Sequence, residues 1–251
     1  MTTGALIFAR NNEHIDYVAM AHWSARNIER HLGIPTHLVT DDTAPSTNCR
    51  HFTDVGTVTW HNLNRMDAYR LSPWDRTLVL DADYIVASDQ LKSLLDADQD
   101  FLAHRRAYDV TGCNTFEGLN TFGDNCMPMW WATVMMFRKS QHAELIFDSM
   151  QMIRDNWNHY RALYKNSVPA YRNDHALTIA LGIVNGHTID HASIPWQLAS
   201  LTPEHKLTQL DKDSYRVDYI DTENRAKWIT LTQDFHAMGK QQLGAIVASN
   251  S

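Results

Sequence analysis

Glycine is scarce in this chain, with 10 residues among 251. Neither a GxxxxGK[ST] nor a GxGxxG sequence occurs. Such glycine-rich loops let backbone amides hold phosphate groups at the start of a helix. Their absence predicts that the charge of any phosphorylated ligand is met by basic side chains or by a metal ion.

Cysteine is scarcer still. The three residues, Cys49, Cys113 and Cys126, are an odd number and show no CxxC spacing, which argues against a disulfide framework or a zinc site. The longest apolar runs, WWATVMMF and LTIALGIV, are much shorter than a membrane span. The opening MTTGALIFARNNEH lacks the basic region and the apolar length of a signal peptide. We therefore expect a soluble, cytoplasmic protein with no membrane span.

A positive net charge is also missing. The formal net charge is −7, which disfavours nucleic acid or an anionic membrane as the main partner, although His104-Arg105-Arg106 is locally basic. Hydrophobic residues make up 44% of the chain, enough for the core of one domain. We expect a single domain over residues 1–251.

Apolar segments of strand length alternate with segments of helical period. Strands are expected at 4–9, 36–42, 53–59, 77–86, 101–107, 130–137 and 188–196. Helices are expected at 13–32, 63–71, 90–95, 141–164 and 173–184, with a short one at the C-terminal end. This order predicts the α/β class: a Rossmann-like domain with a central, mostly parallel sheet and helices on both faces. Segment 109–128 shows no period and is typical of a functional loop.

Polar residues follow three of the expected strands. They are Ala9-Arg10-Asn11, Asp41-Asp42 and Asp81-Ala82-Asp83. In α/β sheets, ligands bind at the carboxyl ends of the strands. The three groups are therefore expected to line one cleft.

Asp81 and Asp83 are the most informative pair. The chain has four Asp-x-Asp sequences, and only this one follows an apolar run of three residues, Leu78-Val79-Leu80. On a continuous strand the two carboxylates would point the same way, and they would repel each other unless a cation lay between them. Mg²⁺ or Mn²⁺ suits such oxygen ligands. His236, in QDFHAMGK, is the candidate third ligand, and its imidazole favours Mn²⁺.

These motifs resemble the GT-A glycosyltransferases, nearest to the retaining group that includes glycogenin and galactosyltransferases. The apolar strand entering Asp81-Ala82-Asp83 matches the Asp-x-Asp motif of that family, and Arg65 has the spacing of its basic donor residue. His236-Ala237-Met238-Gly239 matches its His-x-x-Gly segment. Asn173-Asp174-His175 resembles its Asp-Gln segment beside the sugar. The opening FARNNEHIDY resembles the nucleotide-binding first loop of the family.

The chain also departs from the family pattern at two places. Trp131-Ala132-Thr133, however, replaces the usual Asn-x-Gly, and Lys240 precedes the position of the family lysine. These departures concern the acceptor side and the diphosphate contact.

The resemblance implies a fold, a reaction and a set of roles. A single GT-A domain would transfer a sugar from a nucleoside diphosphate sugar, expected to be a UDP-sugar, with retention of configuration. Asp81, Asp83 and His236 would bind Mn²⁺ or Mg²⁺, and Asp174, with Asp81, would act at the reacting sugar. Donor contacts are expected from Ala9, Arg10, Asn11, Tyr17, Asp42, Arg65, Ala82, Gly239 and Lys240.

The acceptor stays open at this point. The N-terminal part would bind the nucleotide, and residues from about 109 to 240 would form the acceptor side and the metal-binding tail. A protein, a glycan and a lipid-linked sugar are candidates. Nucleic acid is a candidate only as an acceptor, through a hydroxymethylated base of viral DNA.

Two other functions fit parts of the pattern. A haloacid dehalogenase-like phosphatase also places Asp-x-Asp after an apolar strand, with the first Asp as nucleophile. Ile85 stands where that family usually has Thr or Val, and Gly123-Asp124 has no acidic partner at Pro128. A non-catalytic protein that binds nucleotide sugars is the second alternative.

Overall fold

The computed structural model describes residues 1–40, 49–53, 64–116, 119–124, 126–187 and 191–250. A parallel unit opens the chain, formed by β1 (Thr3–Ala9), α1 (Tyr17–Leu32) and β2 (Thr36–Thr40). Helix α1 ends at Gly33, whose φ of 69° is the left-handed conformation that suits glycine after a helix. The predicted first strand is confirmed, and the predicted helix 13–32 is confirmed from Tyr17 onward. The second strand is confirmed up to Thr40, and residues 41–42 lie outside the described residues.

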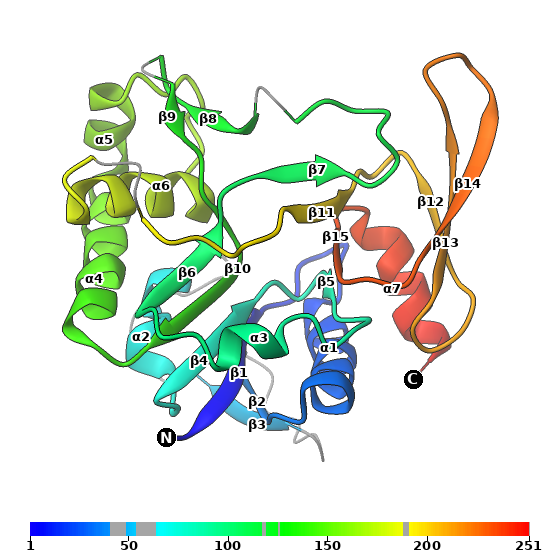
Figure 1. Ribbon diagram of the computed structural model, residues 1–251, viewed down its shortest axis with the longest axis horizontal. Coiled ribbons are helices and arrows are strands. Elements are labelled where there is room, and N and C mark those ends of the chain that lie inside the picture. The colour runs from blue at the N-terminus through cyan, green and yellow to red at the C-terminus, as the bar shows by residue number, and fades with distance from the viewer. Residues whose placement is uncertain (41–48, 54–63, 117–118, 125, 188–190, 251) are drawn as a thin grey trace.

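A six-stranded sheet forms the centre of the fold (Figure 1), in the order β3-β2-β1-β4-β10-β6. Its other strands are β3 (Cys49–Thr53), β4 (Arg76–Leu80), β6 (Phe101–His104) and β10 (Trp131–Arg138). Strands β3, β2, β1 and β4 pair in parallel, whereas β10 is antiparallel to both β4 and β6. The sheet is therefore mixed, and the prediction of a mostly parallel sheet is correct only for its first four strands.

Helices cover both faces of this sheet, as predicted. Ala5 and Ile7 of β1 pack in one apolar cluster with α1, while Leu6 and Phe8 face a second cluster. That second cluster contains residues of α4 (Gln141–Asp155) and α6 (Asn173–Val184). Figure 1 shows α4 and α6 on the left, and α1 with α7 (Lys240–Ser249) on the right. The alternation of side chains along β1 thus supplies both faces.

A second sheet, in the order β5-β15-β11-β7, begins where β4 ends. Its strands are β5 (Tyr84–Ile85), β7 (Ala107–Asp109), β11 (Leu198–Leu201) and β15 (Phe235–Ala237). The predicted single strand at 77–86 is wrong, because the chain leaves the central sheet after Leu80. A turn follows, in which the Tyr84 amide donates to the Asp81 carbonyl at 3.0 Å.

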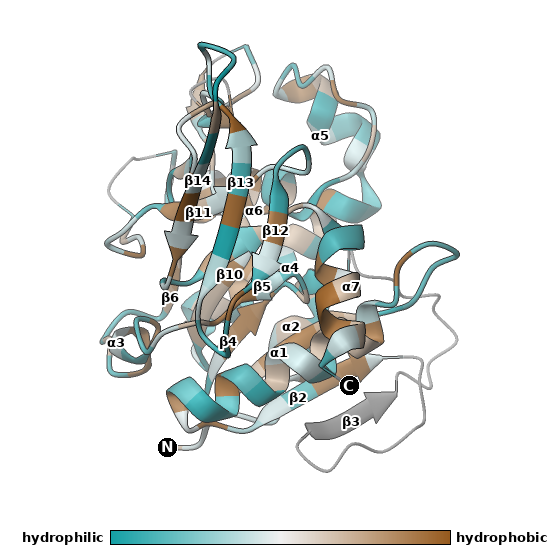
Figure 2. Cartoon of the chain, turned by 90° about the vertical axis from the view of Figure 1, so that its right-hand side faces the viewer, coloured by the Kyte–Doolittle hydropathy of each residue, from teal (hydrophilic) through white to brown (hydrophobic). Residues whose placement is uncertain are grey.

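The remaining elements surround these two sheets. They are η1 (Arg65–Asp67), α2 (Ala68–Leu71), α3 (Lys92–Leu95), α5 (Trp157–Leu163), β8 (Thr121–Phe122), β9 (Met127–Pro128), β12 (Lys206–Gln209), β13 (Tyr215–Ile220) and β14 (Ala226–Leu231). Strands β12, β13 and β14 form an antiparallel sheet beside α7 (Figure 2). No helix of the described residues is long and apolar enough to span a membrane.

Three further sequence expectations need correction. The predicted helix 141–164 is two helices, since Asn156 leaves the helical conformation between α4 and α5. The predicted strand 101–107 is divided between β6 and β7, which belong to different sheets. The prediction of a strand at 188–196 is wrong for residues 191–196, which form no strand, and β11 begins only at Leu198. Residues 188–190, and nearly all of the strand predicted at 53–59, lie outside the described residues.

Gly4 provides a test of how tightly β1 packs. A Cβ built at Gly4 would lie 2.3 Å from the indole ring of Trp74, so the ring or the strand would have to shift. Gly4→Ala is therefore expected to lower the free energy of unfolding by about 1–3 kcal/mol, measured by urea denaturation. At Gly244 in α7 a Cβ would make only ordinary contact, 3.4 Å from Met20 Cε, so Gly244→Ala should not destabilise. Equal losses in both variants would contradict this packing.

Candidate active site

Two carboxylates and one imidazole meet at the junction of the two sheets. Asp81 directly follows β4, and its amide donates to the Thr133 carbonyl of β10 at 3.0 Å. Strand β15 pairs with β5 so that His236 lies opposite Tyr84, the residue after Asp83. The Ala237 amide also donates to the Asp83 carbonyl at 2.9 Å. Backbone pairing thus joins segments that lie about 150 residues apart in sequence.

The three side chains are buried and close enough to share one cation. Asp81, Asp83 and His236 are 9%, 4% and 8% exposed, and one potential ligand atom from each lies within 4.8 Å of the others. Mg²⁺ and Ca²⁺ bind oxygen at about 2.0–2.6 Å, so that two ligands of one ion lie at most about 5 Å apart. His236 Nε2 is 3.4 Å from Asp83 Oδ2. The donor set and its spacing fit a divalent ion.

Two basic side chains already contact these carboxylates. Lys240 Nζ lies 2.7 Å from Asp83 Oδ2, and Arg65 forms an ion pair with Asp81. Burial alone would raise the pKa of Asp83, but the charges of His236 and Lys240 and their hydrogen bonds hold it below its usual range. Burial opposes the charge on Lys240, yet its pairing with Asp83 raises the pKa of that ammonium. The carboxylate and the ammonium are both ionised at neutral pH.

A cavity of about 250 Å³ surrounds this group. The predicted site residues that line it are Tyr17, Arg65, Asp81, Ala82, Asp83, Asp174, His236 and Lys240. It is completed by residues that were not predicted as contacts, namely Phe8, Trp131, Thr133, Arg172, Asn173 and Met238. The structure therefore gathers eight of the predicted residues around one cavity.

The other predicted donor contacts do not line this cavity. Ala9 is buried at the end of β1. Asn11 accepts a hydrogen bond from the Val18 amide at 2.9 Å and so positions the start of α1. Arg10 and Gly239 are also absent from the cavity wall. Asp42 lies outside the described residues.

Asp174 lies in the first turn of α6 with both carboxylate oxygens engaged. Its Oδ1 accepts from the Ala132 amide at 2.8 Å, and its Oδ2 accepts from Arg172 at 3.1 Å. The N-cap position of α6 is Arg172, so Asp174 does not cap this helix. Arg172 was missed, although a basic residue two positions before Asp174 was a signal for it.

Comparison with known proteins gives a likeness in fold only. No protein-family model and no curated protein matches the chain. The glycosyltransferase GlyE of Streptococcus pneumoniae aligns over 78% of this chain and 46% of its own, at 15% identity and a TM-score of 0.49. Galactosyltransferase LgtC, in complex with donor and acceptor sugar analogues, aligns over 71% of this chain and 70% of its own, at 16% identity and a TM-score of 0.44.

A third solved structure is similar to the same extent. The bifunctional glycosyltransferase WbbM aligns over 78% of this chain and 47% of its own, at 13% identity and a TM-score of 0.43. The chain thus spans less than half the length of GlyE and WbbM. All three carry the name of glycosyltransferases, and a likeness of this extent assigns no activity, donor or acceptor to this chain.

Proposed function

We propose that this chain is a metal-dependent glycosyltransferase that moves a sugar from a nucleoside diphosphate sugar to an acceptor. The observation that carries the proposal is the convergence of Asp81, Asp83 and His236 into one buried group on the wall of a cavity. Two carboxylates with an imidazole suit Mn²⁺, with Mg²⁺ as the alternative. A UDP-sugar is the donor that the sequence resemblance implies.

The basic side chains of the site would hold the diphosphate. When bound, the cation would offset the negative charge that grows on the leaving diphosphate. Lys240 and Arg65 contact the same carboxylates that would bind the cation. In the donor complex, Lys240 and Arg65 would donate hydrogen bonds to phosphate oxygens. This role is supported by the lack of any glycine-rich phosphate loop in the chain.

Asp174 would act at the reacting sugar. Its carboxylate is held by the Ala132 amide and by Arg172 on the wall of the same cavity. A fixed negative charge beside the anomeric carbon stabilises the developing oxocarbenium ion. Asp81, which lines the same cavity, would also contribute at the sugar. Retention of configuration is the outcome that the family resemblance predicts.

Release of nucleoside diphosphate tests the proposal. We would incubate the full chain with a panel of sugar nucleotides and Mn²⁺ and measure the free nucleoside diphosphate. Slow release from one of them is expected, lost with EDTA and restored by Mn²⁺. Saturable binding without release would instead indicate a non-catalytic binder. Phosphate release from sugar phosphates without any nucleotide would indicate a phosphatase of the haloacid dehalogenase type.

Replacement of Lys240 should weaken binding of the donor without weakening binding of the metal ion. Lys240→Met removes a cation that contacts Asp83, so Mn²⁺ should bind as tightly as before or more tightly. The donor loses a charged hydrogen bond of about 1.5–3 kcal/mol, and its affinity should fall about tenfold to a hundredfold. Calorimetry with Mn²⁺ alone, and then with Mn²⁺ and UDP, measures both. Lys206→Met, an exposed lysine on β12, is the control, and weaker Mn²⁺ binding in Lys240→Met would contradict this role.

A further inference from the structure

A second cavity, of about 430 Å³, adjoins the strands that carry the metal group. It shares no lining residue with the cavity around Asp83. Its wall nevertheless includes Tyr84, which follows Asp83, and Asp234, two residues before His236. The wall is formed by Tyr84, Gln90, Tyr108, Trp196, Gln197, Ala199, Gln233 and Asp234, which we call the Trp196 cavity. Its volume lies in the range of small-molecule sites, about 300–1,000 Å³.

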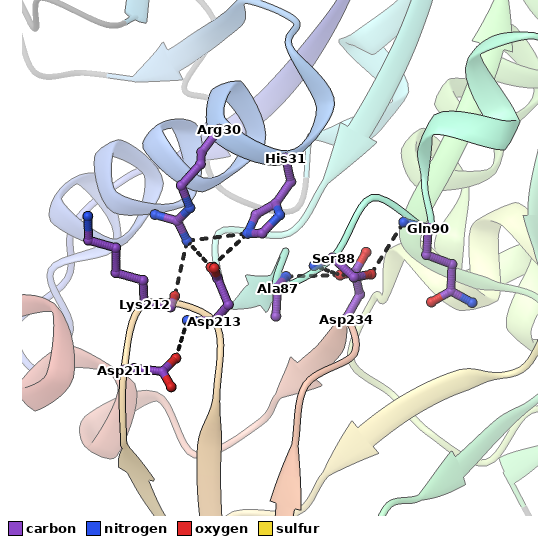
Figure 3. A network of polar contacts seen from close by, with 9 residues as sticks. All are labelled: Arg30, His31, Ala87, Ser88, Gln90, Asp211, Lys212, Asp213 and Asp234. Carbon is purple, nitrogen blue, oxygen red and sulfur yellow. Dashed lines mark hydrogen bonds and ion pairs between the residues drawn. The ribbon is translucent and has the colours of Figure 1, made fainter.

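Asp234 contributes to this cavity a buried carboxylate with hydrogen bonds to only one of its two oxygens. The residue is 3% exposed. Its Oδ1 accepts from the Ala87 amide at 2.9 Å, and from the amide and the hydroxyl of Ser88 at 2.8 Å each (Figure 3). Its Oδ2 has no hydrogen-bond partner in the part of the chain that the structure describes. Buried carboxylate oxygens normally accept hydrogen bonds, so Asp234 brings an unsatisfied acceptor to the wall of this cavity.

The rest of the wall is aromatic and neutral. Three glutamine amides, of Gln90, Gln197 and Gln233, offer donors and acceptors, and Trp196 contributes a half-buried indole ring. Among the described residues, no lysine, arginine or histidine lines the cavity. A phosphate or a nucleic acid backbone would require such cations. An uncharged ligand with an apolar face and many hydroxyl groups, such as a sugar ring, fits this wall.

Shared residues connect the Trp196 cavity to a larger cavity. Tyr108 and Gln197 also line a larger cavity of about 750 Å³, and Phe116 lies in the wall of that cavity. Phe116 stacks on Trp131 with ring centroids 6.4 Å apart and an interplanar angle of 20°. Trp131 lines the cavity around Asp83. The Trp196 cavity therefore adjoins the larger cavity, and the contact between Phe116 and Trp131 places the larger cavity beside the one around Asp83.

We propose that the Trp196 cavity binds a sugar unit of a glycan, and that this glycan is the acceptor. Its further units would cross Tyr108 into the larger cavity and bring a terminal hydroxyl to the cavity around Asp83. The role as acceptor rests on the proposed transferase activity, whereas sugar binding by the cavity does not. Because no basic side chain among the described residues lines the Trp196 cavity, a nucleic acid strand with its phosphates is the wrong ligand for this subsite.

A binding assay without donor tests the inference. We would screen the full chain on a glycan array and follow the hits, with lactose, maltose and chitobiose as soluble probes, by saturation-transfer NMR. Trp196→Ala is expected to weaken binding about tenfold or more. Gln233→Ala should also weaken glycan binding. Because Gln233 is exposed, this variant tests the cavity even if Trp196→Ala does not fold. Trp228→Ala, on an indole that is 60% exposed on β14, is the matched control and should bind as wild type.

Each outcome decides the inference independently of the transferase proposal. Binding that falls in Trp196→Ala and Gln233→Ala, while Mn²⁺ and UDP still bind, supports the cavity. No glycan binding by wild type, or equal losses in Trp228→Ala, overturns it, as does binding of nucleosides in place of glycans. If glycans bind here but no sugar nucleotide binds, the subsite stands and the proposed transferase activity fails.

Discussion

Asp83→Asn is expected to abolish metal-dependent donor binding while the protein stays folded. Asparagine has nearly the same shape but no charge, so it neither ligates the cation strongly nor pairs with Lys240. Changes even in residues that only support metal ligands cost about tenfold to a hundredfold in metal affinity. A direct ligand should cost at least about a hundredfold. Calorimetry with Mn²⁺ and UDP measures the loss, and circular dichroism checks the fold.

The chain contains its own control for this variant. Asp98 belongs to another Asp-x-Asp sequence, in an exposed segment after α3. Asp98→Asn makes the same chemical change and should bind Mn²⁺ and donor as wild type does. Donor and metal binding that survive in Asp83→Asn, or that fall equally in Asp98→Asn, would contradict the assignment.

Asp174→Asn is expected to reduce turnover with little effect on donor affinity. The amide oxygen of asparagine would still accept from the Ala132 amide, which accounts for one of the two contacts of Asp174. The negative charge beside the reacting sugar would be lost, and the loss of one such stabilising group costs about a hundredfold or more in kcat. Initial rates of nucleoside diphosphate release, together with the Kd for UDP, separate the two effects.

Glu144→Gln provides the comparison for a structural role. Glu144 is an exposed carboxylate in the first turn of α4, as Asp174 is in the first turn of α6. Both variants therefore remove a negative charge near a helix N-terminus, with a similar small effect on stability. Only Asp174→Asn should lower kcat. Unchanged turnover in Asp174→Asn would remove this residue from the catalytic group.

Local sequence patterns predicted much of the fold where an element packs along its whole length. Helix α6 has the predicted bounds, 173–184, because one continuous apolar segment faces β10 and α4. Strand β1 was predicted as 4–9 and found as Thr3–Ala9. In both cases the spacing of apolar residues in the sequence matches the residues that are buried in the element.

The prediction failed where pairing between distant segments decides the structure. Residues 77–86 have the composition of one strand, yet Tyr84 and Ile85 pair with β15 in a second sheet. Asp81 and Asp83 therefore approach through a turn, and not by alternation along a strand. Local sequence carries no information on a partner 150 residues away, so the pairing of β5 with β15 could not be derived from periodicity.

The candidate site was predictable to a similar degree. Asp81 and Asp83 were identified from the apolar run before them, whereas His236 required the family motif. Asp234 was not identified, because its partners, Ala87 and Ser88, belong to a distant segment of the chain. Arg172 was missed although its partner, Asp174, lies only two residues away. Ala9, Arg10, Asn11 and Gly239 were expected at the site and lie away from its cavity.

The most direct test of a cation held by Asp81, Asp83 and His236 is electron spin-echo spectroscopy of Mn²⁺ bound to protein labelled with ¹⁵N-histidine. One Mn²⁺ per chain should show coupling to a histidine nitrogen in wild type, and the coupling should vanish in His236→Gln. If wild type binds no Mn²⁺, or if the coupling persists without His236, the cation is not held by this group.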